Sequence, residues 1–146
     1  MSVWGFSRSS SSRPYLASTE ALVITFNWAK SINQDGANPI SSAWADTAAL
    51  AVRLNQTFAG GQTDLAVPFS FNGATLQAAM MRSTQPITVK FGSASSPVFT
   101  LSLKANADFE YSALKGYYAN PIASSIANIY ITTTVAATIT AVFGYN

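Results

Sequence analysis

The chain has 146 residues, of which 49% are hydrophobic and only 10% are charged, and its net charge is +2. A chain of this length is expected to form one domain that buries roughly two thirds of the surface its unfolded state exposes. Cysteine and histidine are both absent, which excludes disulfides, the usual zinc sites, cysteine nucleophiles and histidine-based catalytic triads.

The low fraction of charged residues indicates how the protein associates with partners. A typical soluble domain has roughly 25% charged residues, and a surface with few charges does little to keep copies of a protein apart. The composition therefore favours a subunit that works in contact with others, the alternative being an ordinary Ser/Thr-rich β domain. Arg8 and Arg13 are the only charges before Glu20, and from Glu20 onwards positive and negative residues balance. Two positive charges are too few for a nucleic-acid footprint, so we predict no nucleic-acid partner.

No apolar run in the sequence approaches the length that crosses a bilayer. No apolar segment of the kind found in export signals follows the N-terminus. We therefore expect no membrane partner, and synthesis and assembly in the cytoplasm.

We interpret residues 1–19 as an extended N-terminal arm that precedes a single β-sandwich domain at residues 20–146. The run Ser9–Ser12 has no hydrophobic periodicity and nothing to pack. Aromatic and basic residues flank this run, and such residues dominate binding hot spots. The predicted partner-binding residues of the arm are Trp4, Phe6, Arg8, Arg13 and Tyr15. The alternative is that these aromatic side chains fold back on their own domain.

The first core strand is predicted where apolar and other residues alternate from Ala21 to Trp28. Turn-forming residues then predict a loop over residues 31–43. The segment from Trp44 to Phe58 fits both the helical and the strand period, and a short helix or turn leading into a strand accommodates both.

The strongest local signal is Asn72-Gly73, which lies between apolar alternations at residues 67–71 and 76–80. Both central residues of a type I′ turn need a positive φ, which Asn tolerates and Gly adopts freely. The pair therefore predicts a β-hairpin. A third strand is predicted at Ile87–Phe91, directly after Pro86.

Four more strands follow in the sequence. Alternation predicts strands at residues 99–103, 108–111, 126–133 and 137–143, with a longer aromatic loop at residues 112–125. In the second of these strands the acidic residues are expected on the outward face. The total is about eight or nine short strands at roughly ten-residue spacing, which predicts an all-β antiparallel β-sandwich or jelly roll.

Asp108 and Glu110 form the one carboxylate pair that suggests chemistry. Residues two apart on a strand share a face at roughly 6.5–7 Å, a separation that glycosidases use. Any strand with a solvated acidic face has the same spacing, however, and there is no histidine to activate the many serines. We predict no catalytic residues.

We predict a binding site in the aromatic loop, at Tyr117, Tyr118 and Asn120. Aromatic rings beside an amide can stack on a sugar or fill a pocket on a protein partner. The alternative is that one of the tyrosines covers an end of the sandwich core.

The C-terminal third carries a resemblance to a known class of protein. The segments FTLSLKANADFEY at residues 99–111 and YYANPIASSIANIYITTTVAATITAVFGYN at residues 117–146 resemble small structural proteins of tailed bacteriophages. Within that group the chain is most similar to capsid cement, or decoration, proteins. The resemblance implies a β-sandwich or jelly-roll body, a dimer or trimer, and a position on the outer shell across capsomer boundaries.

The sequence thus predicts a non-enzymatic virion protein, without metal or cofactor, that decorates and stabilises a phage capsid by bridging neighbouring capsid subunits. Its expected partners are the major capsid protein and further copies of itself, and its expected location is the outer capsid surface after assembly in the host cytoplasm. The alternative is a carbohydrate- or receptor-binding module of a phage fibre, collar or tail, binding through the loop at residues 117–120.

Overall fold

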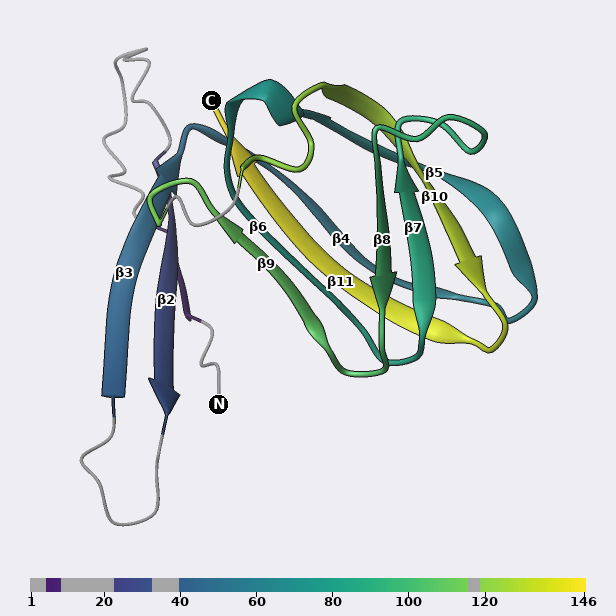
Figure 1. Cartoon of the computed structure of the whole chain (residues 1–146), viewed down its shortest axis with the longest axis horizontal. Helices are drawn as coiled ribbons and strands as arrows, with labels where there is room; N and C mark the ends of the chain where they lie inside the picture. Colours follow the sequence, from purple (N-terminus) through teal and green to yellow (C-terminus); the bar gives the residue numbers. More distant parts are fainter. Residues whose placement is uncertain (1–4, 9–22, 33–39, 116–118) are drawn as a thin grey trace, which may run out of the picture.

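The computed structural model describes residues 5–8, 23–32, 40–115 and 119–146, and these residues form strands with one short 3-10 turn. Every strand pair is antiparallel. The strands make two four-stranded sheets that face each other as a sandwich, and a three-stranded sheet that stands beside them on the left in Figure 1. The predicted all-β, antiparallel sandwich class is confirmed.

The sandwich consists of strands β4 to β11. Their bounds are β4 Leu50–Phe58, β5 Gln62–Asn72, β6 Leu76–Ser83, β7 Ile87–Phe91, β8 Phe99–Leu103, β9 Asp108–Ser112, β10 Ser125–Thr133 and β11 Ala137–Tyr145. One sheet has the order β4-β11-β6-β9 and the other the order β5-β10-β7-β8. Counted from β4, these are strands one, eight, three, six and strands two, seven, four, five, which is the strand order of a jelly roll.

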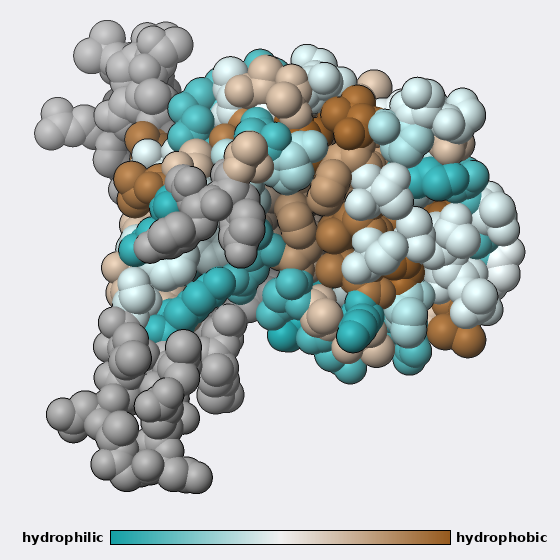
Figure 2. Space-filling view, in the orientation of Figure 1, coloured by the Kyte–Doolittle hydropathy of each residue, from teal (hydrophilic) through white to brown (hydrophobic). Residues whose placement is uncertain are grey.

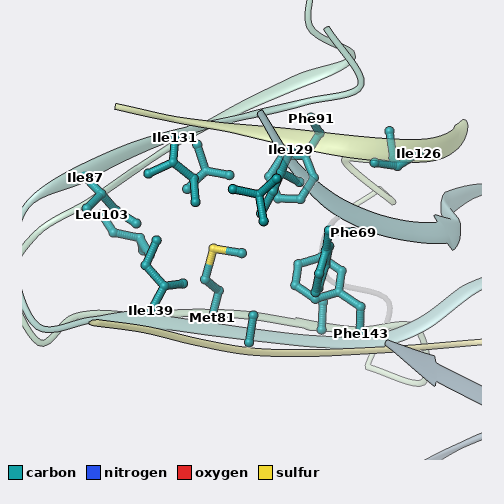
Figure 3. Packing of buried hydrophobic residues seen from close by; sticks show 14 of the residues in the cluster. Phe69, Met81, Ile87, Phe91, Leu103, Ile126, Ile129, Ile131, Ile139 and Phe143 are labelled. Carbon is teal, nitrogen blue, oxygen red and sulfur yellow. The ribbon is translucent and has the colours of Figure 1, made fainter. Parts of the chain in front are cut away.

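The main core lies between these two sheets. Alternate residues of each strand point inward, and Figure 3 shows Phe69 and Phe91 from one sheet facing Met81 and Phe143 from the other. The ring of Phe143 meets Phe69 edge-on, with 5.2 Å between their centroids. Its centroid lies 5.8 Å from that of Phe91. Aromatic rings of this size account for much of the apolar surface that holds two sheets together.

The predicted hairpin at Asn72-Gly73 is wrong, because β5 and β6 belong to different sheets. Asn72 has φ −87°, and its side chain accepts a hydrogen bond from Ala74 N at the start of the 3-10 turn η1, Gly73–Thr75. Gly73 is buried, and a Cβ at this position would lie 2.2 Å from the carbonyl oxygen of Ile122. Glycine is therefore required here for its lack of a side chain, at a corner that carries the chain between the sheets.

The three-stranded sheet, here called the small sheet, contains β1 (Gly5–Arg8), β2 (Ile24–Ile32) and β3 (Ile40–Ala48), in the order β1-β2-β3. It packs on the outer face of the β4-β11-β6-β9 sheet. A second buried apolar cluster fills this contact, and it consists of Phe26, Trp28 and Ala48 from the small sheet with Ala78, Met80 and Val142 from the sandwich. The molecule is thus built in three layers. A single residue, Ala49, separates β3 from β4.

Two predictions for this region are corrected. Strands β2 and β3 occupy residues 31–32 and 40–43, where a loop was expected, and β3 replaces the expected helix or turn after Trp44. The inward face of β3 carries Trp44, Asp46 and Ala48, which are a large, an acidic and a small residue. Such a strand lacks the apolar period that sequence patterns detect.

Candidate functional site

The predicted arm and loop residues are only partly described. Trp4, Arg13, Tyr15, Tyr117 and Tyr118 lie outside the described residues. Within the predicted arm, Phe6 and Arg8 lie in β1, where their backbones pair with Phe26 and Ile24 of β2. The assignment of these seven residues to partner binding stays a prediction.

Asn120 lies in the loop between β9 and β10. Its side-chain nitrogen donates a hydrogen bond to the carbonyl oxygen of Gly73 at 2.7 Å, and its side-chain oxygen accepts one from Ile122 N at 2.9 Å. The amide therefore ties this loop to the corner between the sheets. Its assignment to partner binding is likewise untested.

Asp108 and Glu110 share a face of β9, as expected, and each has its own cationic partner. Arg82 donates to both carboxylate oxygens of Asp108, at 2.7 and 3.0 Å. The ammonium of Lys30 lies 2.6 Å from Glu110. The first pair lies within the sandwich sheet, and the second connects that sheet to β2.

The buried carboxylate of Asp46 joins the small sheet to the sandwich. Its residue is 4% exposed. One oxygen accepts hydrogen bonds from Trp28 Nε1 at 2.8 Å and from the Ser112 hydroxyl at 2.6 Å, and the other accepts one from Leu114 N at 3.1 Å. Donors from β2, from β9 and from the loop after β9 therefore converge on one side chain of β3. A buried carboxylate is tolerated when several donors surround it in this way.

Two tryptophans lie beside the carboxylate of Asp46. Trp28 and Trp44 are directly opposite each other on β2 and β3, and their rings stack with 5.9 Å between centroids and 12° between planes. Trp44 Nε1 donates to the Ser112 hydroxyl at 3.1 Å. Both indole N–H groups are thus bonded, and both rings are held in place.

A hollow of about 290 Å³ opens over these rings, and we call it the tryptophan hollow. Its lining comes from β2, β3, β9 and the loop after β9, and consists of Trp28, Lys30, Ser42, Trp44, Glu110, Tyr111, Ser112 and Lys115. The ammonium of Lys115 lies 4.6 Å from the centroid of Trp44, and that of Lys30 lies 6.0 Å from it. Burial, and secondarily the charge of Asp46, raises the pKa of Tyr111 above its usual value.

The opposite face of the small sheet is exposed, and we call it the outer face. It alternates with the buried face along β2 and β3, and its exposed side chains are Asn27, Ala29, Ala43, Ala45 and Thr47. All five are small and uncharged. Among the described residues no strand pairs with the far edge of β3.

Figure 2 shows a further apolar area, where hydrophobic side chains reach the surface between β8 and β9. Phe99 and Phe109 lie at these two strand edges with 6.0 Å between their ring centroids, and both are only partly buried. These rings close one side of the sandwich.

A scan against protein-family models found no match, and neither did searches of curated proteins and of solved structures. In the described part of the chain, no group of three or more acidic, histidine or cysteine residues could hold a metal ion. None of its helices is long and apolar enough to cross a membrane.

Sequence reasoning missed both Asp46 and the pairing of the two tryptophans. One signal was available, because Trp44 and Asp46 are two residues apart and must share a face if their segment is a strand. The partner strand and its register, which bring Trp28 opposite Trp44, follow only from the fold.

Proposed function

We infer that the chain is a non-enzymatic structural protein of a virion, which decorates a phage capsid and stabilises it by bridging neighbouring capsid subunits. The observation that carries this proposal is the outer face of the small sheet, a surface of small, uncharged side chains on a sheet that buried hydrogen bonds attach to the sandwich. The resemblance of residues 99–111 and 117–146 to small structural proteins of tailed phages supports the same assignment. Jelly rolls recur in viral capsid proteins, but they also occur in lectins and cupins, so the fold alone does not decide the function.

The outer face suits a permanent contact with another protein. Its five side chains carry no charge, so covering them incurs none of the desolvation cost of a buried ion. Small side chains such as Ala43 and Ala45 also let another backbone approach closely. A pleated face of this kind can pack against a second sheet at about 10 Å.

The attachment of the small sheet to the sandwich also favours binding to a partner. The hydrogen bonds to Asp46 and the stacked tryptophans fix the small sheet on the sandwich before any partner binds. A preorganised surface loses less conformational entropy on binding than a flexible one. The sandwich thereby serves as a rigid body that can span the boundary between two capsid subunits.

Stabilisation of the shell follows by mass action. A protein that binds the assembled shell, and not its separated subunits, lowers the free energy of the assembled state by about 2.7 kcal/mol per site at a hundredfold excess over Kd. The shell lattice repeats this gain at every site. No catalytic group is needed.

The proposal is tested by mixing the purified protein with undecorated phage shells and measuring cosedimentation and the melting temperature of the shells. We expect Ala45→Glu to abolish binding, because it places a charge in the centre of the outer face. Ser102→Glu, an exposed position on β8, introduces the same charge on the sandwich and should bind normally. Equal binding of both variants would refute the assigned surface, and failure of the unmodified chain on every shell would refute the function.

The arm is tested separately. We expect a chain lacking residues 1–19 to keep its folded sandwich and to lose attachment, because the truncation removes both the predicted anchors and β1. Light scattering on the full chain should give the mass of a dimer or trimer. A truncated chain that still decorates shells would exclude the arm from the contact.

A further inference from the structure

We propose that the tryptophan hollow is a binding site for a neutral sugar ring. This inference concerns the junction of the small sheet with the sandwich, on the side opposite the outer face, and it does not depend on attachment to a capsid.

The wall of the hollow is a preorganised aromatic platform. Trp44 is half-buried, its ring is stacked on Trp28, and its indole N–H is held by Ser112. A fixed and partly exposed indole ring suits the C–H face of a sugar, because it offers large apolar area at little cost in conformational entropy. The volume of about 290 Å³ is near the lower limit for ligand sites, which fits one ring rather than a large cofactor.

The charges around the hollow cancel, since Lys30 is paired with Glu110 at 2.6 Å and the charge of Lys115 is opposite to that of Asp46. Lys30 and Lys115 supply two positive charges to the lining, and Glu110 supplies one negative charge, with the carboxylate of Asp46 behind the tryptophans. These four charges sum to zero. A cationic ligand would meet two ammonium groups, and an anionic ligand would meet Glu110. A neutral ligand avoids both repulsions.

The same lining contains donors and acceptors together. Ammonium groups donate only, a carboxylate accepts only, and the hydroxyls of Ser42 and Tyr111 do both. A sugar hydroxyl donates and accepts, so a ring with several hydroxyls can bond to each kind of group. Lys115 lies over Trp44 on a flexible stem, so it can move aside to bond a hydroxyl while the sugar takes its place on the ring.

A second hollow indicates room for more than one ring. It has a volume of about 450 Å³ and is lined by Phe109, Glu110, Tyr111, Ala119 and Pro121. Glu110 and Tyr111 line both hollows. An oligosaccharide held at Glu110 therefore has a neighbouring hollow for its next residue, and affinity should rise from a monosaccharide to a disaccharide.

The experiment is an NMR titration of the full chain, following the indole N–H signals of Trp28 and Trp44, assigned with Trp→Phe variants. The neutral probes are the methyl glycosides of glucose, galactose and N-acetylglucosamine and their disaccharides. The charged probes, matched in shape, are glucuronate and glucosamine. We expect a neutral sugar to shift both indole signals with a Kd of about 1 mM, as ligand efficiency allows for so few atoms. We expect its charged counterpart to bind more weakly.

Two matched variants locate the site. Glu110→Gln should weaken binding about tenfold, because a hydrogen bond to a charged acceptor becomes one to a neutral acceptor. Asp108→Asn makes the same change on the same face of β9, two residues away and outside both hollows, and should leave Kd unchanged. Backbone amide spectra report whether each variant stays folded.

Three results would overturn the proposal. The first is that no neutral sugar shifts either indole signal, and the second is that glucuronate or glucosamine binds more tightly than every neutral probe. The third is that Asp108→Asn weakens binding as much as Glu110→Gln. The Ala45→Glu variant tests attachment to the capsid and does not alter the tryptophan hollow. The proposed function and the sugar site can therefore fail separately.

Discussion

The ring of Phe26 lies directly against the backbone of Gly144. A Cβ built on Gly144 would come within 2.4 Å of Cε2 of Phe26 and within 2.9 Å of the Cβ of Ala48. The glycine lies on β11, at the centre of a sandwich sheet, whereas Phe26 belongs to the small sheet. The closeness of the two sheets thus depends on the absence of one side chain.

Gly144→Ala is therefore expected to loosen the small sheet without unfolding the sandwich. Overpacking of a buried contact costs about 1–3 kcal/mol, and here the strain is relieved when the two layers separate. The near-UV signal of the stacked tryptophans should fall while the far-UV β signal stays. Thr140→Ala, on the same face of β11 but away from Phe26, is the control; equal loss of the tryptophan signal in both variants would contradict this explanation.

Asp46→Asn should also weaken the contact between the small sheet and the sandwich, because it removes a buried hydrogen-bond acceptor. An amide has one accepting atom, whereas both carboxylate oxygens of Asp46 accept hydrogen bonds. Either Trp28 Nε1 or Leu114 N must then face an NH₂ group, and an unsatisfied buried donor costs about 1–3 kcal/mol. Tryptophan fluorescence during urea unfolding should show an earlier transition. Asp108→Asn, at a surface ion pair, should shift the transition by no more than about 1 kcal/mol.

Asp64 combines a left-handed backbone with an ion pair. Its φ is +48°, at a bulge where β5 meets β10, and its carboxylate lies 2.8 Å from the ammonium of Lys90. Asp64→Ala should lower the free energy of unfolding by about 1–2 kcal/mol, because alanine tolerates a positive φ poorly and removes the pair. Asp64→Asn keeps a residue suited to this φ and should lose less. Equal losses in urea unfolding would show that only the charge matters.

Tyr111 should make stability fall at high pH. The pKa of this phenol is raised from 10.0 in the folded state, by burial first and by the charge of Asp46 second. Above pH 10 the unfolded chain loses the Tyr111 proton before the folded chain does, so the folded state is favoured less as pH rises. Below pH 10 this contribution to stability is complete. Tyr111→Phe should therefore show a shallower decline in stability above pH 10, measured by urea unfolding across that range. An unchanged decline would contradict the raised pKa.

The sequence predicts the sandwich strands because their inward positions are almost uniformly apolar, as in Ile87–Phe91, which forms β7 as expected. It fails at Asn72-Gly73, because the same local residues suit both a hairpin turn and a corner between sheets. The glycine is explained by the carbonyl oxygens of Ile122 and Ser124, which are distant in sequence. The site was harder still to predict. Asp46 is buried because donors 18 and 66 residues away in sequence reach it, and no local pattern contains that information.

The pairing of β11 has a consequence for synthesis of the chain. β11 is hydrogen-bonded to β4 on one side and to β6 on the other, with Leu50 opposite Tyr145. Such long-range pairing closes late and makes folding slow. Until Ala137–Tyr145 has left the ribosome, β4 and β6 have no strand between them, and their edges are open to other chains. The nascent chain is then most prone to aggregate just before β11 appears.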